Sequence, residues 1–380
     1  GSGKTSVLLQ RIAFLLYRER KTLNPDQVYL FTPNNVFEHY IDTVLPSMGE
    51  SNPQVFTWRD FVASEGASQR DSGEKTNPEQ LLRLEKAVPE LVLEPEDVRE
   101  IRLDGVTLLK ASQVQGAVEK FARFGVGPRF CALVKDELHD RLSRKIAQMS
   151  KDDEAQEEML SLDVDEQVEI FGETVSPDDE NETANLTRQY LEHRFAAAHG
   201  QIDSLTWLRF DRIGMRILGQ SALSATEWLY LKLLITGVGD KNARYVMIDE
   251  VQDYTVAQLM VLAKHFSRAH FLLLGDEHQA IFEGTASFKQ IAEVFKKTHG
   301  GIEECRLLTS YRSSPEITEL FCSLLDHDEQ LKLTSVHRAG VAPVIRELPA
   351  DDPEKYIEEL KAIAVAAASE EGLTAIVAES

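Results

Sequence analysis

Two short clusters of charged and hydroxyl side chains have the composition of a site that handles phosphate. Asp249 and Glu250 directly follow an apolar run. The first carboxylate can hold Mg²⁺, directly or through water, and the second can polarise an attacking water. Near the start of the chain, residues 1–6 (GSGKTS) reproduce the second half of the phosphate-binding pattern G-x-x-x-x-G-K-[ST]. Together, the two clusters predict chemistry on a nucleotide.

The residues of this loop have separate expected tasks. The glycines permit a tight turn whose backbone N–H groups can surround phosphate oxygens. The Lys4 ammonium can reach the β- and γ-phosphates, and the Thr5 hydroxyl can ligate Mg²⁺. The nucleotide-binding residues predicted in this loop are Gly1, Ser2, Gly3, Lys4, Thr5 and Ser6.

Buried parallel strands are the elements that must position these side chains. Residues 245–248 form an unbroken apolar or aromatic run, which indicates a strand covered on both faces, and residues 28–32 and 271–274 repeat the pattern. Residues 6–20 carry an apolar stripe at helical spacing, so a helix should follow the phosphate loop. Open α/β sheets bind ligands at the carboxyl ends of their strands, where Asp249 lies. The alternative is a solvated loop after a core strand.

Four more polar or aromatic residues follow strands that should end at the same sheet edge. Thr32 and Asn34 come after the strand at 28–32, and Thr57 and Trp58 follow a short strand at 54–57. They could contact a nucleic-acid backbone or stack on a base. The alternative is a turn-forming Asn and a core Trp, with Thr57 as the N-cap of a helix.

Between residues 63 and 219 the strand rhythm stops and helices are expected. The predicted helices are 78–88, 96–102, 112–124, 130–150, 185–199 and 206–217. An acidic stretch, 151–185, interrupts them with 14 Asp/Glu and one Lys, a net charge of −13. This stretch could be a solvated surface, or it could mimic nucleic acid towards a basic partner.

Composition and charge exclude several classes of protein. The 380 residues carry a net charge of −22, which argues against a generally basic nucleic-acid binder, although a local basic groove stays open. The three cysteines form no CxxC pair, which fits a reducing compartment such as the bacterial cytoplasm or nucleoid. No apolar run is long enough to span a membrane, so no membrane partner is expected.

Two further motifs complete an ordered set. The motif GDEHQAIF, which contains Asp276 and Gln279, directly follows the strand at 271–274. The motif LLTSYRSSPEI contains Tyr311 and Arg312. The order GSGKT, DEVQD, GDEHQAIF, LLTSYRSSPEI resembles the UvrD/Rep-like branch of superfamily 1 helicases. The resemblance covers the chain apart from the helical segment. It implies an α/β fold with tandem RecA-like motor domains, ATP and Mg²⁺ as cofactors, and single-stranded DNA or a DNA junction as partner.

The resemblance also implies residue roles. Lys4 and Thr5 match the phosphate-loop Lys and its hydroxyl ligand, and Asp249 matches the second Mg²⁺ ligand. The implied catalytic residues are Glu250 as base, Gln279 as γ-phosphate sensor and Arg312 as first arginine finger. The implied base-stacking and strand-contacting residues are Tyr311 near the adenine, and Thr32, Asn34, Thr57 and Trp58 on single-stranded DNA.

Some residues depart from the helicase pattern. After residues 279–282 (QAIF) helicases continue with an aromatic residue and Arg-Gly-Ala, whereas residues 283–287 are EGTAS, and Ser310 replaces the usual Asn. With the acidity and the phrases FTPN and TVLP, these departures resemble HelD-type proteins. That group is similar to helicases but uses ATP to release RNA polymerase from nucleic acid. RNA polymerase is therefore the alternative partner.

The motifs also predict the domain organisation. Residues 1–62 and 220–296 should form a discontinuous first motor domain around a mainly helical insertion, 63–219, and residues 297–380 should begin a second motor domain. The first Gly of the phosphate loop and the later helicase motifs, including a second arginine finger, fall outside the sequence. A fragment with weak or no ATPase activity of its own is therefore expected.

Overall fold

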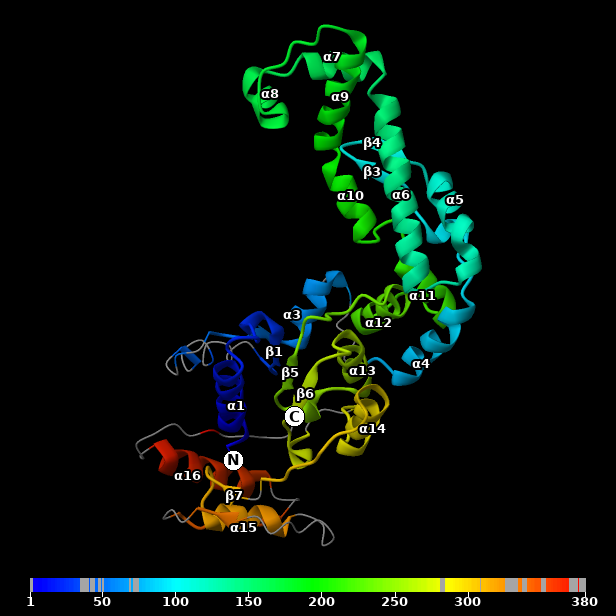
Figure 1. The fold of residues 1–380 in the computed structure, drawn as a ribbon. Helices are drawn as coiled ribbons and strands as arrows, with labels where there is room; N and C mark the ends of the chain where they lie inside the picture. Colours follow the sequence, from blue (N-terminus) through cyan, green and yellow to red (C-terminus); the bar gives the residue numbers. More distant parts are fainter. Residues whose placement is uncertain are drawn as a thin grey trace. The chain divides into compact units, whose positions relative to one another are not determined.

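Four parallel strands form the sheet that carries the candidate site (Figure 1). They are β1 (Val28–Phe31), β2 (Gln54–Phe56), β5 (Tyr245–Ile248) and β6 (His270–Leu273), hydrogen-bonded in the order β2-β1-β5-β6. Val28 pairs with Tyr245, which pairs in turn with His270. Because all the strands run the same way, the loops after them meet at one edge. The chain is thus an α/β protein with a parallel sheet.

The computed structural model describes most of the chain. The described residues are 3–34, 51–67, 75–280, 284–307, 309–324, 334–336, 340–349 and 353–368, with 41, 45, 46, 49, 70 and 375. Gly1 and Ser2 lie outside them. So do most of residues 36–45, for which the sequence predicts a helix, and most of residues 374–380, for which it predicts a strand.

Side chains of the sheet alternate between two cores, as expected of strands covered on both faces. On one face, Leu30 and Met247 pack with the apolar stripe of α1 (Lys4–Arg18). On the other face, Phe31 and Ile248 join a larger core. That core is built with α3 (Trp58–Val62), α12 (Ala225–Thr236) and α13 (Val256–His265). The predicted two-sided burial is confirmed for β1 and β5, whereas the side chains of β6 are only partly buried or exposed.

A mainly helical segment connects α3 to α12 and shares the larger core. Its helices are α4 (Pro78–Ala87), α5 (Ala111–Phe121), α6 (Pro128–Met149), α7 (Asp153–Leu160), α8 (Val164–Phe171), α9 (Glu180–Arg194), α10 (Ala196–Asp203) and α11 (Phe210–Leu218). The predicted helices at 78–88, 112–124 and 130–150 are confirmed to within a few residues, and that at 206–217 begins later than expected.

Two predictions about this segment are wrong. The helix expected at 96–102 is instead a single 3₁₀ turn followed by an antiparallel hairpin of β3 (Ile101–Leu103) and β4 (Val106–Leu109). Asp104 and Gly105 both take positive φ, which makes this tight turn possible. The acidic stretch is no interruption, since it folds into α7 and α8. Asp163 starts α8 by accepting a hydrogen bond from the Glu166 backbone at 2.9 Å.

The chain divides into two compact units, residues 4–304 and a second unit of residues 305–380 with 1–3. In the first unit α14 (Phe288–His299) packs beside α13. The second unit contains a parallel pair, β7 (Thr309–Ser310) with β8 (Thr334–Ser335), and the helices α15 (Pro315–Ser323) and α16 (Pro353–Ala368). No helix among the described residues is long and apolar enough to cross a membrane. The predicted boundaries at 62, 219 and 296 stay predictions.

Candidate nucleotide site at the carboxyl edge of the sheet

The amino end of α1 presents the phosphate-loop residues that the structure describes. Gly3 has a φ of 74°, a left-handed conformation that glycine adopts without strain, and α1 begins at the next residue. Lys4, Thr5 and Ser6 therefore form the first turn, where backbone N–H groups lack helical acceptors. The turn contains no acidic residue. Unpaired N–H groups and the helix dipole make such an end attractive to an anion.

Asp249 lies beside this turn because β5 ends there. Its backbone N–H donates to the carbonyl of Phe31 at 3.0 Å, which continues the β1–β5 pairing by one residue. The Thr5 hydroxyl donates to a carboxylate oxygen of Asp249 at 3.3 Å. Burial raises the pKa of Asp249 above its ordinary value, and the neighbouring Glu250 carboxylate raises it further. Negative charge is thus concentrated where a cation would relieve it.

The spacing of Thr5 and Asp249 suits Mg²⁺. Two adjacent ligands of an octahedral Mg²⁺, each at about 2.0–2.1 Å, lie about 2.9 Å apart. The two oxygens are 3.3 Å apart, so a small side-chain movement would bring both into the coordination shell. No group of three or more His, Cys, Asp or Glu among the described residues is arranged to hold a metal. The two side chains therefore fit an ion that also takes phosphate and water ligands.

Glu250 has an unusual backbone for its type. Its φ of 50° and ψ of 49° are left-handed, a conformation that costs a residue with a side chain about 1–3 kcal/mol and clusters at functional sites. The Nε2 of Gln252 donates to one carboxylate oxygen of Glu250 at 2.8 Å. That bond fixes one oxygen of the carboxylate and leaves the other for a further ligand.

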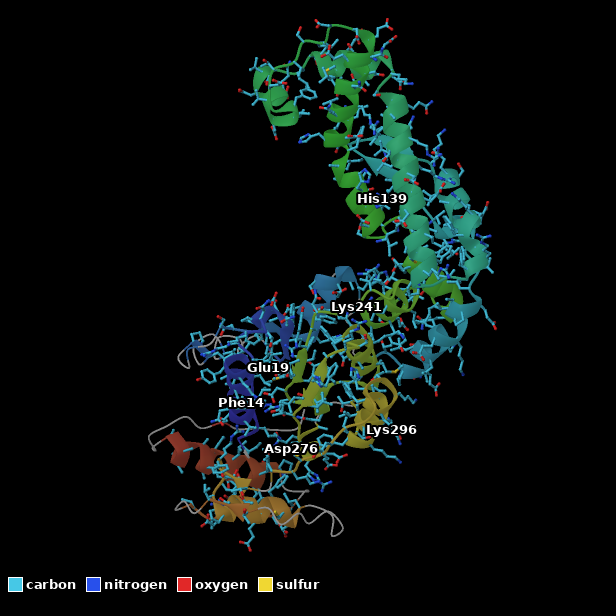
Figure 2. All side chains as sticks on the ribbon, in the orientation of Figure 1. Phe14, Glu19, His139, Lys241, Asp276 and Lys296 are labelled. Atoms are coloured by element: carbon cyan, nitrogen blue, oxygen red, sulfur yellow. The ribbon has the colours of Figure 1, made fainter. Side chains whose placement is uncertain are left out.

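Asp276 connects the loop after β6 to the phosphate loop, and Figure 2 labels it near the end of the sheet. Its carboxylate accepts from the Lys4 ammonium at 3.4 Å and from Gln279 Nε2 at 2.9 Å. Its backbone N–H donates to the side-chain oxygen of Gln252 at 3.0 Å. The Gln252 amide therefore links Glu250 to Asp276. The sequence alone indicates no role for Gln252 and no contact between Asp276 and Lys4.

Gly275 allows this link. A Cβ at position 275 would lie 2.7 Å from the side-chain oxygen of Gln252 and 2.8 Å from a methyl of Val251. Both distances are too short for a real side chain, so any other residue would displace the amide. The short distances explain in local steric terms why glycine precedes Asp276 in the motif.

The four expected nucleic-acid contacts follow β1 and β2 at the same edge, with different exposures. Asn34 is exposed, while Thr32 is buried and donates its hydroxyl to the Asn34 carbonyl at 3.2 Å. Thr57 caps α3 by accepting from the backbone of Asp60 at 3.2 Å, which confirms the N-cap prediction. Trp58 is only 7% exposed and packs against the ring of Phe61, so stacking on a base would require it to be uncovered.

Tyr311 and Arg312 belong to the second unit. Both side chains are exposed just before α15, with Tyr311 at 58%. The Ser310 hydroxyl accepts from the backbone of Ser313 at 3.2 Å, so Ser closes the turn that carries them. Their proposed contact with nucleotide stays a prediction.

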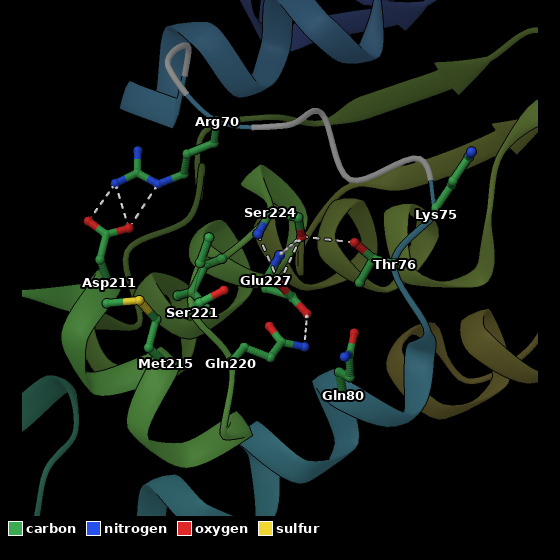
Figure 3. A pocket seen from close by; sticks show the side chains of 12 residues that line it. Arg70, Lys75, Thr76, Gln80, Asp211, Met215, Gln220, Ser221, Ser224 and Glu227 are labelled. Atoms are coloured by element: carbon green, nitrogen blue, oxygen red, sulfur yellow. Dashed lines mark hydrogen bonds and ion pairs between the residues drawn. The ribbon is translucent and has the colours of Figure 1, made fainter.

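A separate pocket of about 640 Å³ lies in the helical segment, and Figure 3 shows its lining. On one side, Arg70 forms a bidentate ion pair with Asp211, in which Nε donates to Oδ1 at 3.1 Å and Nη2 donates to Oδ2 at 2.7 Å. Elsewhere Glu227 accepts from the backbone and hydroxyl of Ser224 as the capping box of α12. These polar groups satisfy one another, and none of the candidate nucleotide residues lines this pocket.

The assignments of the candidate nucleotide-binding residues rest on the geometry of the site, because the comparisons with family models and with curated proteins found no match.

Proposed function

We propose that the chain is part of an ATP-driven motor of the UvrD/Rep type, with tandem RecA-like folds, that couples ATP hydrolysis to movement on single-stranded DNA or at a DNA junction. One observation carries the proposal. Lys4 and Thr5 lie within hydrogen-bonding reach of Asp276 and Asp249, residues that follow two neighbouring parallel strands. The residues proposed to bind phosphate and Mg²⁺ thus lie close together.

Each side chain has a proposed task. The first turn of α1 and the Lys4 ammonium bind the β- and γ-phosphates, with Lys4 exchanging Asp276 for phosphate oxygens. Thr5 and Asp249 would hold Mg²⁺, which when bound neutralises developing phosphate charge. Glu250, oriented by Gln252, accepts the proton of the attacking water. In this proposal Gln279 responds to the γ-phosphate, while Arg312 and Tyr311 contribute from the second motor domain.

A HelD-type ATPase that releases RNA polymerase from nucleic acid is the second candidate. One observation favours it over a plain helicase. The exposed α7–α8 region is strongly acidic, and it would repel the phosphates of DNA within a Debye length, about 8 Å at physiological salt. A protein partner with a basic surface would be attracted instead.

Two substitutions in the natural full-length protein test the ATPase proposal. Glu250→Gln should retain ATP binding but slow hydrolysis by about 10²-fold or more, because the amide cannot accept the water proton. Lys4→Ala should weaken nucleotide binding. Glu100→Gln and Lys21→Ala, two exposed positions away from the site, are the matched controls. Wild-type turnover in the Glu250→Gln protein would refute the assignment.

Strand displacement and polymerase release distinguish the two candidates. A DNA motor should separate a duplex with a single-stranded tail, and this activity should be lost in Glu250→Gln. A HelD-type protein should free RNA polymerase from a nucleic-acid complex and show little unwinding.

A further inference from the structure

The acidic stretch carries an apolar surface that its own fold leaves uncovered. Leu160 at the end of α7 is 53% exposed, and Val164 and Val168 on α8 are 62% and 48% exposed. The two valines are four residues apart, so they share one face of the helix. No side chain of α8 is fully buried. Val164 and Val168 form the aliphatic face, and Leu160 is exposed on the preceding helix.

This face belongs to a folded element. Met159 of α7 is 1% exposed, and Ile170 and Phe171 of α8 pack against the core. Glu158 of α7 forms an ion pair with Arg194 of α9. Both short helices contact α9, and Figure 1 shows them at one end of that helix. The apolar side chains that point outward are therefore not needed to hold α7 and α8 in place.

The stretch that carries the aliphatic face is also rich in free carboxylates. Of the 14 acidic residues in 151–185, five take part in ion pairs or helix caps. Nine exposed carboxylates have no partner among the described residues: Asp152, Asp153, Glu154, Glu157, Asp165, Glu169, Glu173, Asp178 and Glu180. Exposed aliphatic groups in a stretch with many unpaired charges have the composition of a protein interface with a polar rim.

We propose that the aliphatic face docks on another protein, at an apolar groove bordered by Lys and Arg. Charge complementarity decides the class of partner. DNA, RNA and an anionic lipid surface would all be repelled by the net charge of −13 in 151–185. A second copy of the chain would bring two such regions together and is disfavoured for the same reason. A basic protein surface gains both from apolar burial and from electrostatic steering.

The proposal deepens the second candidate function by giving the surface and chemistry of its partner. It can be tested apart from that function because binding through α7 and α8 requires no nucleotide. If ATP hydrolysis fails its own test while this docking succeeds, the two conclusions are separated.

The experiment measures the binding of fluorescent model peptides to the whole chain by anisotropy at physiological ionic strength. The first probe is an amphipathic helix of Leu and Lys, and the second replaces every Leu by Ser. Val164→Ser/Val168→Ser should weaken binding of the Leu/Lys peptide about tenfold, because the exposed parts of the two valines amount to about one whole side chain. The matched control is Val92→Ser/Val238→Ser, at 76% and 57% exposure.

A double substitution that reverses the charge of two acidic residues tests whether the carboxylates of α7 and α8 contribute to binding. Glu157→Lys/Glu169→Lys places cations near helix C-termini, where they do not oppose the helix dipole, so both helices should remain folded. Binding should weaken at least tenfold and depend less on salt. Glu90→Lys/Glu100→Lys makes the same change in net charge at exposed sites elsewhere. Circular dichroism checks that each variant remains folded.

Several outcomes would overturn the proposal. One is equal binding by the α7–α8 variants and their controls, which would assign the affinity to the overall negative charge. Another is equal binding of the Leu/Lys and Ser/Lys peptides. Self-association of the chain that disappears in Val164→Ser/Val168→Ser would make the face a contact between copies. Salt-sensitive binding of single-stranded DNA that is lost in the same variant would make the face a nucleic-acid site.

Discussion

Gln252→Met should destabilise the first unit and disturb the candidate site. Gln252 is 3% exposed, and its amide joins Glu250 to the backbone of Asp276. Met has nearly the same length but cannot form either bond. The hydrogen bond to the Glu250 carboxylate is worth about 1.5–3 kcal/mol and the neutral one about 0.5–1.5 kcal/mol. Better burial of an apolar side chain offsets about 1 kcal/mol, so we expect a loss of about 2–3 kcal/mol.

Urea unfolding followed by tryptophan fluorescence is the assay. All three tryptophans, Trp58, Trp207 and Trp228, lie in the unit of residues 4–304, so the signal reports that unit. Gln10→Met, at an exposed position on α1, is the control and should change the unfolding free energy by less than about 0.5 kcal/mol.

A second substitution should have an effect like that of Gln252→Met, because it acts on the same hydrogen-bonded link. Gly275→Ala should destabilise the same unit because the new methyl group displaces the Gln252 amide. Combining it with Gln252→Met should cost less than the sum of the two single changes, since both remove one link. A loss for Gln252→Met no larger than that for Gln10→Met would refute the argument that this amide holds the site together.

Three further changes test other parts of the first unit. Gly239→Ala should cost about 1–3 kcal/mol in thermal unfolding, because its Cβ would overlap the backbone carbonyl of His265; unchanged stability would mean that the loop has space. Asp97→Ala should cost about 3 kcal/mol, since this carboxylate is 0% exposed and pairs with two arginines that would lose it; a loss below about 1 kcal/mol would contradict that. Burial, followed by the charge of His139, lowers the pKa of His199, whose Nδ1 lies 2.6 Å from the Nδ1 of His139. The unfolded chain therefore takes up the proton first, and this part of the stability is present above pH ~6.5 and lost as pH falls through the lowered pKa. The difference in unfolding free energy between wild type and His199→Gln should accordingly shrink from pH ~7.5 to ~5, and a difference independent of pH would contradict the argument.

Local features of the chain were predictable from the sequence. An apolar run without alternating polar residues indicates a strand that is buried on both faces. The sequence of residues 245–248 therefore predicts β5 and places Asp249 directly after it. The stripe that packs α1 under the sheet and the Thr57 cap depend on residues a few positions apart. The hairpin at 101–109 was also within reach, because its Asp104-Gly105 turn is a recognisable signal.

Contacts between distant residues were decided by the tertiary structure. Lys4 meets Asp276 across 272 residues, and no local pattern links them. The bridge from Glu250 through Gln252 to Asp276 exists because β5 and β6 are neighbours and because Gly275 leaves space for the amide. Periodicity and spacing determine which face of an element is apolar, but the order of strands in the sheet determines which polar side chains meet at its edge.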